Sequence, residues 1–242
     1  MKEYVKNSDK FLSIYNELDS HLRKSLNMEE NVSHSFLIQK MAEKDRVVNK
    51  YYYDLKTFAK LRNAIVHNPD CRIANPIAEP HEYIVKRYEE IKNKVKNPPI
   101  ALNTIAIKAQ DIYNTTMKSN ALYVMQEMNK NSYTHVPVVD KGALIGVFSE
   151  NTVFSYLVKN QLFALDNDIL IEEFAEFIPI NSHGSEYFEF VSKNTLVMDI
   201  GEIFQKGLKD NKRISIVFIN ETGNIKEKIL GLITPWDLAG FY

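Results

Sequence analysis

The sequence predicts a multi-domain protein in which an all-α helical bundle is followed by an α+β domain. Up to about residue 95, apolar residues recur with the three- and four-residue spacing of helices. Asn97-Pro98-Pro99 then forms a stiff break, because proline fixes φ and lacks a backbone N–H. Beyond it, one strand–turn–strand–helix phrase occurs twice, as VPVVDKGALIGVFSENT at 136–152 and as IVFINETGNIKEKILGLITPWD at 216–237. We therefore expect domains at 1–98 and 99–242.

The composition is that of an ordinary soluble protein. Hydrophobic residues make up 45% of the 242 residues, and charged residues make up 25%. No apolar run approaches the roughly 20 residues that cross a bilayer, and the first residues lack the apolar core of a signal peptide. These features predict a cytoplasmic protein that does not contact a membrane. The single cysteine, Cys71, excludes an internal disulfide and a cysteine-built zinc site.

Charge is distributed unevenly along the chain. Residues 1–100 carry 18 Lys and Arg against 14 Asp and Glu, whereas residues 101–242 carry 12 against 17. The first half therefore tolerates a polyanionic partner, and the second half does not depend on one. Duplex DNA is not an expected partner, because a dedicated DNA-binding protein would show a denser basic face.

Three helical segments are predicted in the first half. Apolar spacing indicates a helix at about 9–26, with Ser8 or Asp9 as its N-cap. The run from about 35 to 66 contains neither Gly nor Pro, and it predicts one long helix or two helices joined end to end. A further helix is expected at about 81–95, before the proline break.

The end of the long helical run carries a short polar motif, LRNAIVHNP at 61–69. Arg62 is followed directly by Asn63, and four residues separate Arg62 from His67. At the close of the central helix of an all-helical domain, this pattern resembles the HEPN family. The signature of that family is an Arg, often followed by Asn or another polar residue, with a His four to six positions on. The resemblance covers about residues 8–97 and implies a metal-independent RNase or an inactive domain that binds RNA or a protein partner.

Arg62, Asn63 and His67 are the candidate catalytic residues. Cleavage of RNA through its 2′-hydroxyl requires a base, an acid and a cation near the developing phosphorane charge. His67 would serve as base or acid, and Arg62 is suited to a bidentate phosphate contact. Asn63 lies one helical turn before His67 and shares its face. Because one His cannot easily do both jobs, the HEPN resemblance implies a homodimer in which both copies of the motif converge on one cleft.

A structural origin of the same motif remains open. The helix dipole favours a His in the last turn, Asn68-Pro69 is an ordinary stop signal, and Arg62 would then be a solvated side chain. No metal is predicted, because the remaining histidines lack metal-ligand spacing among themselves. These are His21, His34, His81, His135 and His183.

The second half contains one α+β unit twice, in repeats at about 100–160 and 170–242. The first repeat is predicted to hold helices at 121–129 and from Ser149 onward, with strands at 136–139 and 143–148 between them. The second is predicted to hold strands at 187–191, 214–219 and 229–233, and helices at 197–208 and from Pro235 onward.

The order of these elements and the turn phrase PVVDKGALIG resemble a CBS domain pair, or Bateman module. The resemblance covers about residues 100–242. Modules of this family commonly bind adenine nucleotides in the clefts between their two repeats and regulate the domain attached to them. The resemblance therefore implies AMP, ADP or ATP as a regulatory ligand.

The family's nucleotide motif is a Gly, two apolar residues, a Thr or Ser, two further residues and an Asp. The second repeat matches it in full from Gly231 through Thr234 to Asp237. The resemblance implies that Thr234 contacts phosphate and Asp237 the ribose hydroxyls. The first repeat keeps Ser149 but has Thr152 where the Asp should stand. We expect one good site at Thr234 and Asp237, and a second site at Ser149 that is empty, weaker or suited to another ligand.

The segment Thr234-Pro235-Trp236-Asp237 is also typical of a simple helix start. It has a capping residue, a Pro at the first helical position and a carboxylate at the third. The two interpretations are compatible, because a capped helix start can leave backbone N–H groups free for phosphate.

Together, the two halves predict a sensor joined to an effector. The leading hypothesis is a cytoplasmic homodimer in which an adenine nucleotide, bound by the CBS pair, controls RNA cleavage or RNA binding by the HEPN-like domain. The alternative is a non-catalytic, nucleotide-binding regulator whose helical domain docks a protein partner. A third hypothesis is a stress-response scaffold in which both sites are vestigial.

Overall fold

A computed structural model describes residues 6–29, 31–66 and 78–241 of the chain. The chain divides into two compact units, Met1–Pro98 and Pro99–Tyr242, and each unit is described by itself. His67 and Cys71, which were singled out from the sequence, lie outside the described residues.

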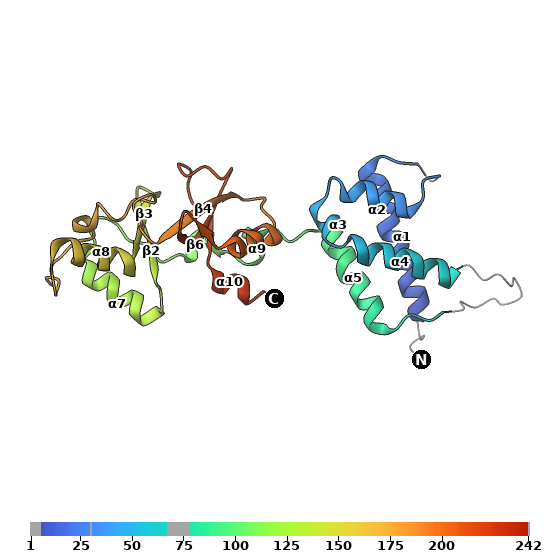
Figure 1. Ribbon diagram of the computed structural model, residues 1–242, viewed down its shortest axis with the longest axis horizontal. Helices are drawn as coiled ribbons and strands as arrows, with labels where there is room; N and C mark the ends of the chain where they lie inside the picture. The colour runs from blue at the N-terminus through green and yellow to red at the C-terminus, as the bar shows by residue number, and fades with distance from the viewer. Residues whose placement is uncertain (1–5, 30, 67–77, 242) are drawn as a thin grey trace, which may run out of the picture. The chain divides into compact units, whose positions relative to one another are not determined.

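The first unit is helical throughout its described elements. These are α1 (Asn7–Leu26), α2 (His34–Ala42), α3 (Arg46–Lys50), α4 (Tyr52–Val66) and α5 (Glu82–Lys96). Helix α1 contacts α2, α4 and α5, and α2 also contacts α4. In Figure 1 the blue α1 runs among the other helices of this unit.

Three aromatic side chains form the centre of the helical unit. Phe11 of α1, Phe58 of α4 and Tyr88 of α5 are all buried. Their ring centroids lie 4.4 to 6.1 Å apart. Each such burial contributes about 2 kcal/mol to folding, so this contact holds three helices around one core.

Helix α1 begins earlier than the sequence predicts. Its first residue is Asn7, and Lys6 rather than Ser8 or Asp9 holds the N-cap position. The predicted cap is therefore wrong. Ser8 is buried, and its backbone N–H donates to Oε1 of Glu79 at 3.0 Å. A carboxylate from a distant part of the chain thus satisfies an N–H that a local capping side chain would otherwise take.

The apolar run from 35 to 66 forms three helices rather than one or two. Asp45 separates α2 from α3, because it is the N-cap of α3. Its carboxylate accepts the backbone N–H of Val48 at 2.8 Å. Tyr51 leaves helical geometry at φ −100° and ψ 16°, and α4 starts directly after it. These two breaks need neither Gly nor Pro, and they let α2 fold back against α4.

The second unit contains two sheets. The larger has the strand order β1-β7-β6-β4, with β5 also paired to β6, and the smaller consists of β2 and β3. The strands are β1 (Ile107–Lys108), β2 (His135–Asp140), β3 (Ala143–Ser149), β4 (Glu186–Ser192), β5 (Leu208–Lys209), β6 (Lys212–Asn220) and β7 (Gly231–Ile233). The helices are α6 (Ala101–Thr104), α7 (Ala121–Asn131), α8 (Glu150–Asn160), α9 (Val197–Lys206) and α10 (Pro235–Ala239), with short 3-10 turns at η1 (Ala109–Asp111) and η2 (Ile171–Phe174).

The same topology occurs twice in this unit. In the second repeat, β4 crosses over through α9 to pair in parallel with β6, which then pairs antiparallel with β7. In the first, Thr115 forms a parallel bridge with Val138 of β2 across α7, and β2 then pairs antiparallel with β3. A helix follows each hairpin, α8 in one case and α10 in the other. The structure therefore has the α+β duplication that the repeated phrase predicts.

The leading segments of the two repeats are exchanged. Strand β1 pairs with β7, so residues 101–108, which the sequence places in the first repeat, lie with the second. Conversely, Pro179 bridges to Gly146 of β3. Both of these close backbone contacts require a glycine. A Cβ on Gly146 would lie 2.0 Å from the carbonyl oxygen of Ile178, and a Cβ on Gly231 would lie 2.9 Å from the carbonyl oxygen of Ile107.

A hydrophobic cluster joins the two repeats. Val147 of β3 is buried against Phe188, Ile216, Phe218 and Leu232 of the larger sheet. Each repeat also has its own apolar cluster between its strands and helices. The repeats are therefore packed as one body, and polar groups at their boundary are held in fixed positions.

Candidate functional site

A cavity of about 640 Å³ opens in the second unit, with walls from both repeats. The first repeat contributes Tyr113, Thr134 and His135, and the second contributes Arg213, Ser215, Thr234 and Trp236. This volume lies within the range of small-molecule sites.

The cavity walls combine three kinds of chemistry. Arg213 brings a cation and Thr234 a hydroxyl, both of which suit an anionic group. The carboxylate of Asp111 is an acceptor for hydroxyl groups. Tyr113 stacks on Tyr133 with ring centroids 6.1 Å apart, which provides a flat aromatic wall. The arrangement suits a ligand with a flat ring, hydroxyls and a negative charge.

Of the four residues predicted to bind a cofactor, Thr234 lines this cavity. Oδ2 of Asp237 accepts hydrogen bonds from the backbone N–H and the hydroxyl of Thr234, both at 2.7 Å. Asp237 therefore fixes Thr234 at the start of α10, as in a capping box. Gly231 is buried in β7 beside β1, where its lack of a side chain admits the backbone of Ile107.

Ser149 is buried at the start of α8 and is not among the residues that line the cavity. Its Oγ accepts the backbone N–H of Thr152 at 3.2 Å, and Oγ1 of Thr152 accepts the backbone N–H of Ser149 at 3.1 Å. Thr152, which stands in the place of the family's Asp, thus completes a capping box. The Ser149 hydroxyl donates to Oε1 of Glu186 at 2.7 Å.

Glu186, the first residue of β4, is the centre of a buried polar cluster that the sequence does not reveal. Its exposed fraction is 4%. Oε1 accepts from Ser149 and from Nδ1 of His183 (2.9 Å), and Oε2 accepts from Nε2 of His135 (2.7 Å), Nδ2 of Asn151 (3.0 Å) and Oγ of Ser215 (3.4 Å). Burial by itself would raise the pKa of Glu186, but the hydrogen bonds from His135, His183 and Ser149 outweigh it and hold the pKa well below the usual range.

His183 faces acceptors with both ring nitrogens. Nδ1 contacts Oε1 of Glu186, and Nε2 contacts the carbonyl oxygen of Ile178 at 3.2 Å. Both ring nitrogens are therefore engaged, and His183 holds Glu186 next to the backbone of Ile178.

In the helical unit, Arg62 is partly buried and packs against α1. Its guanidinium carbon lies 5.2 Å from the ring centroid of Tyr15 of α1, and its Nη1 donates to Oδ1 of the exposed Asn63 at 3.4 Å. Its Nε is buried and has no hydrogen-bond partner among the described residues. The contact with Tyr15 restrains the guanidinium through a cation–π interaction.

His34 lies next to this pair, although its sequence position gives no signal of it. Its ring centroid is 4.2 Å from that of Tyr15, and its Nδ1 bonds Oδ1 of Asp19 at 2.6 Å. Burial lowers the pKa of His34, and the Asp19 carboxylate offsets part of that effect. The structure therefore brings Arg62, Tyr15 and His34 together on α4, α1 and α2, while the predicted partner His67 lies outside the described residues.

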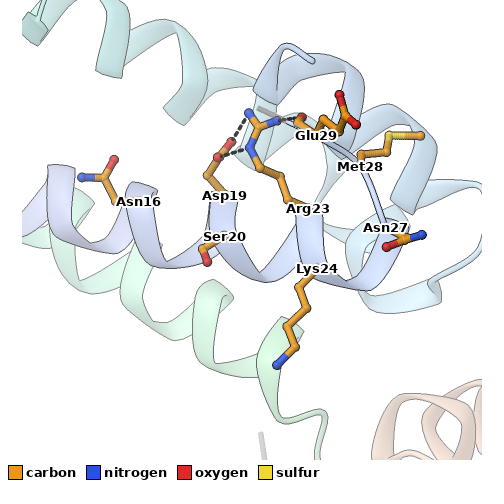
Figure 2. Close-up of a pocket in the computed structure, with 8 residues that line it drawn as sticks. All are labelled: Asn16, Asp19, Ser20, Arg23, Lys24, Asn27, Met28 and Glu29. Carbon is orange, nitrogen blue, oxygen red and sulfur yellow. Dashed lines mark hydrogen bonds and ion pairs between the residues drawn. The ribbon is translucent and has the colours of Figure 1, made fainter. Parts of the chain in front are cut away.

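A polar hollow of about 810 Å³ lies over the C-terminal half of α1. Figure 2 shows Arg23 reaching toward Asp19 and the backbone of Glu29, whereas Lys24 points to the other side of the helix. Arg23 donates Nε to Asp19 at 2.6 Å, Nη1 to the carbonyl of Glu29 at 2.6 Å and Nη2 to the carbonyl of Val32 at 2.8 Å. Its guanidinium thus ties the loop after α1 to the helix and is already used by the fold.

Neither a metal centre nor a membrane span is found in the part of the chain that the structure describes. No three His, Cys, Asp or Glu residues there are grouped so as to hold a metal ion. No helix there combines the length and the apolar character needed to cross a bilayer.

Comparison with protein families identifies a CBS domain at residues 114–159. This segment holds α7, β2, β3 and most of α8, which is the first copy of the repeated topology. With the second copy that follows it, the match supports a CBS domain pair of α+β fold in the second unit. No curated protein sequence matches the chain.

Several solved structures of CBS proteins are similar to the chain. CBSX2 in complex with AMP is 12% identical with a TM-score of 0.42, and the match covers 59% of this chain and 95% of that one. CbpB in complex with c-di-AMP is 17% identical with a TM-score of 0.39, covering 57% and 80%. A CBS domain protein from Streptococcus pneumoniae is 15% identical with a TM-score of 0.41, covering 66% and 90%.

Proposed function

We propose that the CBS pair senses an adenine nucleotide, AMP, ADP or ATP, and that the helical unit is the effector it regulates. The observation that carries this proposal is the cavity between the repeats, into which Thr234 of the complete nucleotide motif projects from the start of α10. The family match at residues 114–159 supports the same assignment.

Different residues of the cavity wall are proposed to contact different parts of the nucleotide. Arg213 and Thr234 hold phosphate, Asp111 accepts ribose hydroxyls, and the aromatic wall of Tyr113 packs against adenine. The Thr234 hydroxyl donates to Oδ2 of Asp237, and a bound phosphate would compete for that proton. The family motif implies that Asp237 would then accept a ribose hydroxyl.

Replacement of Thr234 by Val tests the proposed site. A hydrogen bond to a charged group is worth about 1.5–3 kcal/mol, so Thr234→Val should weaken nucleotide binding about 10-fold or more, while Thr234→Ser should retain it. Calorimetric titration of the full chain with AMP, ADP and ATP gives the affinities. Thr57→Val, on the exposed face of α4, is the matched control. Unchanged affinity in Thr234→Val would refute the site.

The helical unit is proposed as a HEPN-like effector. Arg62 and His67 would act together in metal-independent RNA cleavage, with a second copy of the chain supplying the opposing pair. A nucleotide could control this activity only if it binds one arrangement of the dimer better than another, because equal affinity shifts nothing.

The second candidate is a non-catalytic regulator whose helical unit docks a protein partner. The packing of Arg62 on Tyr15 favours it, because a guanidinium held against α1 with a buried Nε is a structural group. This candidate predicts nucleotide binding that is lost in Asp237→Ala, together with no RNA cleavage under any ligand condition.

A further inference from the structure

We propose that Glu186 occupies, from within the chain, the anion position of the first repeat, so that the pair binds one anionic ligand rather than two. The ligand count rests on the proposed nucleotide-sensing function. The occupied position itself rests on the contacts of Glu186 alone.

The two repeats offer equivalent hydroxyls in different surroundings. Ser149 follows Gly146 by three residues and starts α8, just as Thr234 follows Gly231 and starts α10. Thr234 projects into the open cavity, whereas the 1% exposed Ser149 donates to Glu186. An external anion that sought Ser149 would meet a carboxylate already in place.

The surroundings of the Glu186 carboxylate are those of an anion site. Its two oxygens receive five donors, from hydroxyl, amide and imidazole groups of both repeats. Charge-assisted bonds of this kind are about twice as strong as neutral ones. Glu186 is also anchored by its backbone, because it pairs with Arg213 at the start of the β4–β6 ladder. The strand pairing therefore fixes the backbone from which the carboxylate reaches these donors.

The occupied position adjoins the open cavity. His135 and Ser215 line the cavity, and both also donate to Oε2 of Glu186. Glu186 thus fixes two wall residues of the open site while it fills the closed one. A second carboxylate at residue 152 would repel Glu186 here, so the Thr at this position fits an anion position that Glu186 already fills.

The ligand count is tested by titrating AMP into the full chain. Wild type is expected to bind one AMP per chain. Ser149→Ala should bind the same number, and Thr234→Val should lose it. Two AMP per chain in wild type, with one lost in Ser149→Ala, would overturn the proposal. If wild type binds no AMP, the proposed nucleotide function fails. The second experiment then tests by itself whether Glu186 occupies an anion position.

The second experiment removes the carboxylate of Glu186 and supplies acetate in solution in its place. Glu186→Ala removes a methylene and a carboxylate, which together correspond to one acetate ion. Acetate should raise the thermal midpoint of Glu186→Ala more than chloride does at equal ionic strength, and should not do so for wild type. Glu189→Ala, on the same strand, is the matched control. If Glu186→Ala does not fold, recovery of its circular dichroism in acetate is the readout. Equal effects of acetate and chloride would refute an anion position.

Discussion

Two carboxylates, Asp19 and Glu186, each hold a histidine by a short hydrogen bond. Asp19 binds His34 at 2.6 Å, and Glu186 binds His135 at 2.7 Å. Burial alone would raise the pKa of Asp19, yet hydrogen bonds from Arg23 and His34 lower it. A carboxylate whose folded pKa is lowered stabilises the fold above its ordinary pKa and loses that effect in acid. Both units therefore contain groups that favour folding at neutral pH.

The stability contributed by Glu186 should depend on pH. Glu186→Gln removes the charge and leaves His183 and His135 facing an amide, so we expect a loss of about 3 kcal/mol at pH 7. The folded pKa of Glu186 is lowered, so the difference from wild type should be full above about pH 5 and shrink as the pH falls below 4.5. Urea unfolding at pH 7 and pH 3 measures it. A difference that stays constant over this range would contradict the assignment, and Glu189→Gln is the control.

At the scale of elements, close backbone contacts position the two hydroxyls of the nucleotide motif. In each repeat, a glycine three residues before the hydroxyl admits the backbone of a neighbouring segment. That contact fixes the last strand of the hairpin and the start of the helix that follows. The glycines of the motif are thus explained by strand packing, without any contact to a ligand.

Gly146→Ala should destabilise the second unit. Its Cβ would meet the carbonyl of Ile178 at 2.0 Å, so the bridge between β3 and Pro179 must shift. Overpacking of this kind costs about 1–3 kcal/mol. Gly184→Ala is the matched control, because a Cβ there has nothing within 4 Å, and it should change stability by less than about 0.5 kcal/mol. Chemical denaturation of both variants gives the comparison, and equal stability would contradict the packing account.

At the scale of the whole molecule, the chain joins two units that each have their own core. The α+β unit contains the cavity, and the helical unit contains Arg62. The proposed sensor and the proposed effector lie on separate compact units, and one assay can read both.

RNA cleavage should require His67 and respond to nucleotide if the effector is an RNase. Loss of a general acid or base costs about 10²- to 10⁴-fold in rate, so His67→Ala should abolish cleavage while the fold stays intact. A labelled RNA pool, incubated with wild type and variant with and without ATP, ADP and AMP, provides the measurement. His81→Ala, an exposed histidine before α5, is the control. Activity retained in His67→Ala would eliminate the catalytic role, and an intact, nucleotide-binding protein that cuts no RNA would favour the docking alternative.

The sequence by itself determined the features that depend on local spacing. Period and turn residues located α1, α5, α7 and the hairpins, and the repeated phrase predicted the duplicated α+β unit. The CBS domain in the first repeat is confirmed by the family match. The helix start at Thr234 was also visible, because a capping box is a contact between residues three apart.

Only the tertiary structure decided the contacts between residues far apart in the chain. Glu79 replaced the expected cap of α1, Asp45 broke the long apolar run, and the leading segments of the two repeats were exchanged. It also buried Ser149 behind the cavity wall and placed Glu186 against it, across 37 positions of sequence. No local pattern encodes such a pairing, because the energy of a buried carboxylate depends on the donors that the whole fold gathers around it.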